Sequence, residues 1–199
     1  MSHHIYQTRA FIIDGSDIGE ANRLITLFTE DLGFIYAAVQ GVRLMKSKLR
    51  PSMQDMSFSK VSLVRGKELW RMTDAEKLIS LHDRRLNPKI RKLFSEELSF
   101  LKRLAQGESR HEELFNFLSK FCEFVLKHPS FSIEHVATLD VLAKMNILHE
   151  LGYGSDEGSI KEFSSGSGFS FSEASVLSAE EHLKELKDHI QKALQSSHL

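Results

Sequence analysis

Four cations lie close together in the stretch GVRLMKSKLR, residues 41–50. Arg43, Lys46, Lys48 and Arg50 fall within eight residues, and no acidic residue separates them. Guanidinium and ammonium groups form charge-assisted hydrogen bonds with phosphate oxygens. The spacing therefore favours a loop that binds a polyanion, although a solvated surface loop without a ligand has the same composition.

The charge of the chain is distributed unevenly. The whole sequence holds 26 Lys and Arg against 27 Asp and Glu, yet residues 40–71 hold eight basic side chains and two acidic ones. Such a local field attracts polyanions even where the whole molecule is close to neutral. Single-stranded nucleic acid also needs flat faces on which bases stack. Further cations and aromatic rings that could join this surface are Arg65, Lys67, Arg71, Phe34, Tyr36 and Trp70.

Residues 1–79 have the composition of short strands separated by turns. Asp14-Gly15 predicts a turn after the first strand, and the loop 65–68 with its central Gly predicts a hairpin. The predicted strands are 4–14, 22–29, 34–41, 58–64 and 69–76. Five short strands without an intervening helix indicate a small antiparallel β barrel.

Residues 80–199 change to helical periodicity, so the fold class is α+β with an all-α second domain. The predicted helices run from Asn87-Pro88 to Gly107, over 110–127, from a cap at Ser132 to Gly152, and onward from a capping box of Ser178 and Glu181. Ser and Gly dominate residues 153–177, which predicts a flexible loop.

No residue pattern predicts a catalytic or metal site. The S-x-x-K matches at Ser57 and Ser99 fall in a predicted strand and a predicted helix, where both serines look structural. His182 and His189 lie two helical turns apart, about 10 Å, which is too far for one ion without a third element. Cys122 is the one cysteine and lies on an apolar helix face. We expect no catalytic residue, no metal and no cofactor.

Several short motifs, in this order, resemble the amino-terminal domain of the RecO family of bacterial recombination mediators. They are Gly19-Glu20 before the second strand, Leu27-Phe28-Thr29 followed by Gly33, Gly41-Val42-Arg43 followed by Lys46-Ser47-Lys48-Leu49, then Gln54, and Thr-Asp-Ala-Glu at 73–76. The resemblance covers about residues 5–80. It is looser in the helical half, where Leu151-Gly152-Tyr153 resembles the family's segment before a zinc ribbon.

The resemblance implies an OB-fold domain followed by an α-helical domain. It implies a non-enzymatic DNA repair protein that binds single- and double-stranded DNA and anneals complementary strands. Its implied partners are RecR and the acidic carboxyl-terminal tail of the single-stranded-DNA-binding protein, so that RecA loads on coated strands. The implied DNA contacts are Arg43, Lys46, Lys48 and Arg50, with Arg9, Arg23, Arg65, Lys67 and Arg71 as further candidates.

The sequence departs from the family pattern in one chemical respect. Many members carry four cysteines in the carboxyl-terminal half, where this chain has a Gly/Ser-rich stretch, so no zinc site is expected there. An apolar run long enough for a signal peptide or a membrane span is also missing, and we expect a cytoplasmic, nucleoid-associated protein. Two alternatives stay open: an OB-fold adapter whose basic loop binds an acidic protein, and an enzyme that uses Ser99 with Lys102.

Overall fold

The fold comes from a computed structural model that describes residues 4–105, 107–128, 135–153, 158–164 and 170–196. The chain divides into two compact units. The first comprises residues 1–86 together with 106–112, and the second comprises 87–105 together with 113–199. The short connection between the first two helices therefore belongs to the same unit as the sheet.

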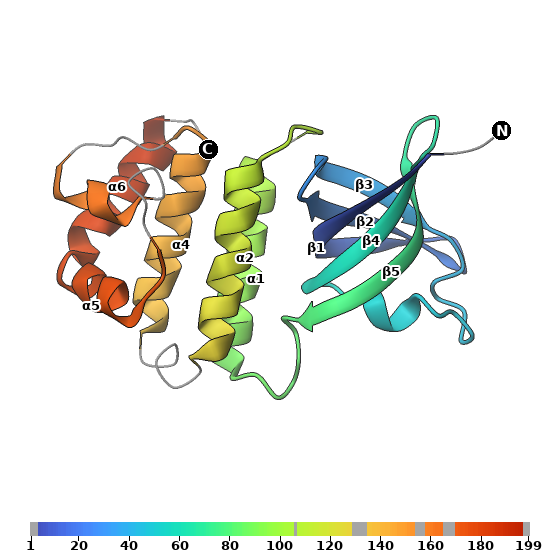
Figure 1. Cartoon of the computed structure of the whole chain (residues 1–199), viewed down its shortest axis with the longest axis horizontal. Coiled ribbons are helices and arrows are strands. Elements are labelled where there is room, and N and C mark those ends of the chain that lie inside the picture. The colour runs from blue at the N-terminus through green and yellow to red at the C-terminus, as the bar shows by residue number, and fades with distance from the viewer. Residues whose placement is uncertain (1–3, 106, 129–134, 154–157, 165–169, 197–199) are drawn as a thin grey trace. The chain divides into compact units, whose positions relative to one another are not determined.

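The first unit is a five-stranded barrel (Figure 1). Its strands are β1 (Ile5–Ile18), β2 (Asn22–Thr29), β3 (Gly33–Val39), β4 (Ser57–Arg65) and β5 (Trp70–Ser80). β1 pairs with both β2 and β4, and a short parallel contact between Ala37 of β3 and Trp70 of β5 closes the order β1-β2-β3-β5-β4. The predicted small OB-type barrel is confirmed.

Alternating residues of all five strands fill the barrel interior. Side chains such as Ile12, Leu27 and Leu63 are fully buried there. Val42 and Met53 join the same cluster although both lie in the long connection between β3 and β4, which also carries the short 3₁₀ helix η1 (Arg50–Ser52). The core of the barrel therefore holds both ends of the basic stretch.

The predicted turn after Asp14 is wrong, because β1 continues to Ile18. The register of β1 against β2 shifts between Ile12 and Asp14, which marks a bulge. Beyond the bulge β1 continues to pair with β2 as far as Ile18. The lack of a side chain at Gly15 allows Arg23 to lie close to the backbone of β1, because a Cβ at this position would lie 3.0 Å from the guanidinium group of Arg23. The turn itself lies at Gly19, whose φ of +59° suits glycine. β5 also runs beyond its predicted end, to Ser80.

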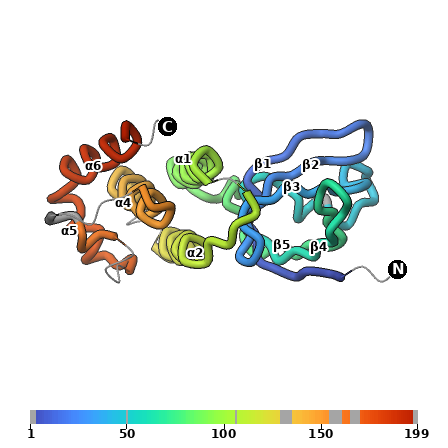
Figure 2. Tube along the Cα trace, turned by 90° about the horizontal axis from the view of Figure 1, so that it is seen from above, coloured from blue at the N-terminus to red at the C-terminus, as the bar shows by residue number. Residues whose placement is uncertain are grey.

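The second unit is helical, as predicted (Figure 2). Its elements are α1 (Pro88–Leu104), α2 (Glu112–Lys127), α4 (Val136–Glu150), η2 (Gly158–Phe163), α5 (Glu173–Glu181) and α6 (Leu183–Ser196). α4 packs against both α1 and α6, and Phe94 of α1 meets Phe121 of α2 edge to face at 6.1 Å. No helix among the described residues has the length and apolar character needed to cross a bilayer.

Two details of the helical unit correct the sequence predictions. Ser178 lies inside α5; the capping box instead pairs Ser172 with Ser175, so the helix begins earlier. The flexible-loop interpretation fails for the described parts of 153–177, because Phe163 is buried and its carbonyl accepts a 2.8 Å hydrogen bond from Asn146. The predicted cap Ser132 and residues 154–157 and 165–169 lie outside the described residues.

A buried carboxyl group lies within the helical unit. Glu97 of α1 is 2% exposed, and neither of its oxygens has a hydrogen-bond partner among the described residues. Burial raises its pKa well above 4.5, and the nearby Asp140 carboxylate raises it further, while Lys144, whose Nζ lies 3.9 Å from Glu97 Oε1, partly offsets the shift. The folded protein therefore holds a proton that the unfolded chain releases above about pH 4.5.

The raised pKa predicts that Glu97 makes the folded state less stable as the pH rises. Below pH 4.5 the group is neutral in both states and costs nothing extra; as the pH rises toward the folded pKa, ionisation in the unfolded chain favours unfolding. Glu97→Gln is expected to flatten this decline and to raise the melting temperature at pH 8 more than at pH 5. Thermal unfolding followed by circular dichroism measures both.

The matched control for this prediction is Glu96→Gln. Glu96 is the adjacent carboxylate, partly exposed and paired with Lys92 at 3.5 Å. The Glu96→Gln variant should show a pH dependence of the melting temperature close to that of the wild type. Equal profiles for all three proteins would contradict a raised pKa at Glu97.

Candidate nucleic-acid interface

The basic loop, residues 40–56 between β3 and β4, is anchored at both ends. Val42 and Met53 are each 2% exposed and pack into the barrel core. The backbone N–H of Arg43 donates to the carbonyl of Ala21 at 3.0 Å. Two successive turns follow, closed by hydrogen bonds from Leu44 N–H to Gly41 and from Ser47 N–H to Leu44. The loop therefore leaves the barrel in a defined direction.

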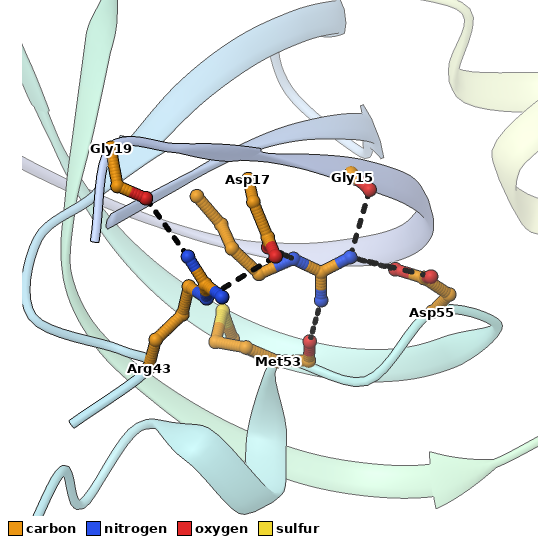
Figure 3. A network of polar contacts seen from close by, with 7 residues as sticks. Gly15, Asp17, Gly19, Arg43, Met53 and Asp55 are labelled. Atoms are coloured by element: carbon orange, nitrogen blue, oxygen red, sulfur yellow. Dashed lines mark hydrogen bonds and ion pairs between the residues drawn. The ribbon is translucent and has the colours of Figure 1, made fainter. Parts of the chain in front are cut away.

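Arg23 of β2 connects the base of this loop to the barrel through contacts with Gly15, Met53 and Asp55, which are labelled in Figure 3. Its Nη1 donates to the carbonyl of Met53 at 3.0 Å, and its Nη2 donates to the carbonyl of Gly15 at 2.9 Å and to Asp55 at 3.0 Å. The side chain is only 19% exposed. This geometry gives Arg23 a structural role, while its predicted contact with DNA stays a prediction.

Arg43 belongs to the same network but keeps a larger exposed surface. Its Nη1 donates to the carbonyl of Gly19 at 2.9 Å, and its Nε lies 3.2 Å from Asp17. The other oxygen of Asp17 lies 3.5 Å from Nε of Arg23, so one carboxylate bridges the two guanidinium groups (Figure 3). The side chain of Arg43 is 40% exposed, which leaves part of an oriented guanidinium group accessible to a phosphate.

Lys46 and Lys48 are cations of the basic loop that point to solvent without a protein contact among the described residues. Both are exposed, and no hydrogen bond or ion pair engages either of them within the described part of the chain. Arg50 lies in η1, and its side chain falls outside what the structure describes. Because an ammonium group without a protein partner gives up no existing contact on meeting a phosphate, these two lysines suit an external polyanion.

A groove of about 1100 Å³ lies between the basic loop and the end of β5. Lys77, His82 and Arg84 line it opposite Arg43, and sequence analysis missed all three. The run His82-Asp83-Arg84-Arg85, which begins two residues after the end of β5, was the available signal. The walls of the groove are mixed in charge, since Glu20, Asp55 and Asp83 also line it.

Asp83 carries a fixed negative charge on the groove wall. Hydrogen bonds from the side chain and backbone of Arg85 lower the pKa of Asp83 to about 2, so the carboxylate stays ionised at neutral pH. The paired guanidinium of Arg85, 2.7 Å from the carboxylate, offsets part of this charge.

A second hollow of about 710 Å³ forms at the β4–β5 hairpin. Arg65, Lys67 and Arg71 line it, and it shares no lining residue with the groove. Arg65 is engaged by Glu108 at 2.6 Å and lies over the ring of Trp70 at 4.8 Å. Lys67 and Arg71 are exposed with no partner in the described residues. The predicted site residues thus form two basic surfaces on one barrel.

The structure corrects the aromatic part of the predicted surface. Trp70 is 5% exposed and donates its indole N–H to Glu108 at 3.2 Å. Phe34 is buried and stacks on Phe28 at 4.8 Å. Neither ring is accessible to a base. Tyr36 is 53% exposed on β3 and remains available for stacking.

Arg9 is committed to a structural pair. Its Nε and Nη2 both donate to Glu30, at 2.8 and 2.6 Å. These hydrogen bonds lower the pKa of Glu30, so the pair persists at mildly acidic pH. Its predicted role in DNA binding would require phosphate to compete with this bidentate contact.

Two of the residues considered for catalysis, Ser57 and Cys122, have structural surroundings. Ser57 is fully buried and its hydroxyl donates to the carbonyl of Gln54 at 2.8 Å. Cys122 is buried, and this burial raises its pKa far above that of a reactive thiol. Across the described ranges, no group of three His, Cys, Asp or Glu side chains is placed to hold a metal ion.

The Arg23 network predicts a stability effect distinct from that of the exposed lysines. Arg23→Ala would leave the carbonyls of Gly15 and Met53 without their donor, which costs about 1–3 kcal/mol of unfolding free energy. Lys48→Ala is the control, because Lys48 makes no contact that the fold needs. Urea unfolding followed by Trp70 fluorescence measures both. Equal midpoints for the two variants would contradict the structural role of Arg23.

Comparisons with known proteins agree with this geometry. Residues 1–81 match the family described as "Recombination protein O N terminal". A protein named DNA repair protein RecO from Dehalococcoides mccartyi strain 195 is 39% identical over 77 residues, which cover 39% of this chain and 30% of that protein. The protein of the same name from Gloeothece citriformis is 37% identical over 75 residues, covering 38% of this chain and 26% of that protein.

A longer match extends into the helical unit. DNA repair protein RecO from Clostridium novyi is 28% identical over 153 residues, which cover 76% of this chain and 58% of that protein. The chain therefore spans between about a quarter and three fifths of the relatives it matches. Barrel order, basic loop and sequence agree: residues 1–81, the amino-terminal barrel, match the amino-terminal domain of the RecO family.

Proposed function

We propose that this chain is a DNA-binding recombination mediator that acts in bacterial DNA repair. The observation that carries the proposal is the pair of exposed lysines, Lys46 and Lys48, on a loop held at both ends by Val42 and Met53. An anchored loop loses little conformational entropy on binding, so its cations meet phosphates at low cost. The similarity to proteins named for DNA repair supports the same role.

The two basic surfaces suggest how the barrel promotes strand annealing. Arg43, Lys46 and Lys48 serve one strand, and Lys67 and Arg71 at the hairpin hollow serve a second. Neutralising phosphates on both strands reduces the repulsion that opposes their pairing. The proposed activity needs no bond-making step, so the chain acts as a binding protein and not as an enzyme.

Protein partners form the second part of the proposal. The helical unit would dock RecR and the acidic tail of the single-stranded-DNA-binding protein, which places the barrel on coated strands in the bacterial cytoplasm and prepares them for RecA. What supports this part is the match of residues 1–81 to the family's amino-terminal domain and the longer match into the helical unit.

The salt dependence of DNA binding tests the role of the basic loop. Log affinity for a labelled single-stranded oligonucleotide should fall linearly with log salt, by about 0.7 for each phosphate neutralised. Lys46→Ala with Lys48→Ala removes two contacts and should reduce this slope by about 1.4. Fluorescence anisotropy at several salt concentrations measures the slope, and an annealing assay should slow in parallel.

The control removes the same charge elsewhere. Lys184 and Lys187 are exposed on α6 and have no partner within the described residues, so Lys184→Ala with Lys187→Ala lowers the net charge equally. The control should keep the wild-type slope. An affinity that is flat against salt in the wild type, or a slope unchanged in the loop variant, counts against the proposal. Loss of binding to an acidic peptide with unchanged DNA binding would favour the adapter alternative.

A further inference from the structure

An apolar side chain protrudes from the middle of the cationic loop. Met45 is 92% exposed, the largest exposed fraction of any large hydrophobic residue in the described part of the chain, and the adjacent Leu44 is 57% exposed. Scattered surface hydrophobics are common, but a methionine that touches almost nothing, set between Arg43 and Lys46, lies within the surface proposed to bind DNA.

The local backbone explains why Met45 projects. The hydrogen bond from Ser47 N–H to the Leu44 carbonyl, 3.0 Å, makes residues 44–47 a turn with Met45 and Lys46 at its central positions. Side chains at the centre of a turn point away from the chain that enters and leaves it. The base of the loop is fixed by Val42 in the core and by the 3.0 Å hydrogen bond from Arg43 N–H to Ala21. Met45 is therefore a protruding tip on a rigid base.

The charges around Met45 indicate which class of molecule this tip would contact. Arg43, Lys46 and Lys48 surround it in sequence, and no carboxylate lies between residues 40 and 54. An apolar protein surface would leave these cations without partners. A polynucleotide satisfies both chemistries, because phosphates line its edge and apolar base faces lie directly inside them. Proteins that bend or open DNA insert side chains such as Met, Leu and Ile between base steps.

We propose that Met45, supported by Leu44, is a wedge that inserts between stacked bases while Lys46 and Lys48 hold the flanking phosphates. This inference rests on the proposed DNA-binding function and adds to it a separate action, which is the unstacking of bases. Unstacked bases on a held strand are free to test a complementary strand, so the wedge would aid annealing beyond charge neutralisation.

The test uses the full chain and oligonucleotides that carry 2-aminopurine, whose emission rises when the base leaves the stack. The wild type should raise this emission on both single-stranded and duplex probes. Met45→Gln keeps the length of the side chain and removes its apolar character. It should lose the emission increase while its affinity changes less than about threefold, because lost burial is offset by the unstacking no longer needed.

Leu177→Gln is the matched control, since Leu177 is 50% exposed on α5 and belongs to the helical unit. It should behave as the wild type does. An emission increase that persists in Met45→Gln, or that the wild type never shows although it binds DNA with a salt-dependent affinity, overturns the wedge but leaves the proposed function standing. Absence of salt-dependent binding in the wild type overturns both. If Met45→Gln gives the same emission increase as the wild type but loses a protein interaction, the protruding tip at Met45 is assigned to a protein partner.

Discussion

The guanidinium group of Arg23 is the interaction on which the basic surface depends. It joins two segments that are distant in sequence: the last part of β1 at Gly15, and the exit of the basic loop at Met53 and Asp55. A loop that carries several positive charges repels itself and would otherwise extend into solvent. Hydrogen bonds from one mostly buried arginine, together with the burial of Val42, keep it against the barrel.

Asp17 divides the cations of this region into two kinds. It lies within 3.5 Å of both Arg23 and Arg43, and so it offsets positive charge at the base of the loop. Lys46 and Lys48 lie beyond this carboxylate and stay exposed. The base is thus close to neutral and rigid, whereas the tip is positive and accessible. The same division recurs at the hairpin, where Glu108 engages Arg65 and leaves Lys67 and Arg71 exposed.

Much of the fold was predictable from local patterns, because strand composition and helical periodicity act over a few residues. The five strands, the helical second half and the cationic cluster at 43–48 all follow from such signals. The role of Arg23 was not predictable, because it depends on carbonyls that meet only in the folded barrel. Gly15 was misread for the same reason: its lack of a side chain serves Arg23 and not a turn.

The same limit applies to the candidate site. Trp70 has the composition of a stacking platform, yet its indole N–H is held by Glu108 from the connection between α1 and α2. Lys77, His82 and Arg84 come from a segment that is close to the loop in space and about thirty residues away in sequence. Charged and aromatic residues can be found in the sequence, but only the closed barrel shows which of them share a surface.

Hydrogen–deuterium exchange of the full chain, free and saturated with a single-stranded oligonucleotide, tests the central claim most directly. An interface built on the basic loop predicts slower exchange at residues 41–48 and along the groove wall at 77–84, with the core strands unchanged. Protection confined to the helical unit, with residues 41–48 exchanging as fast as in the free protein, would contradict it.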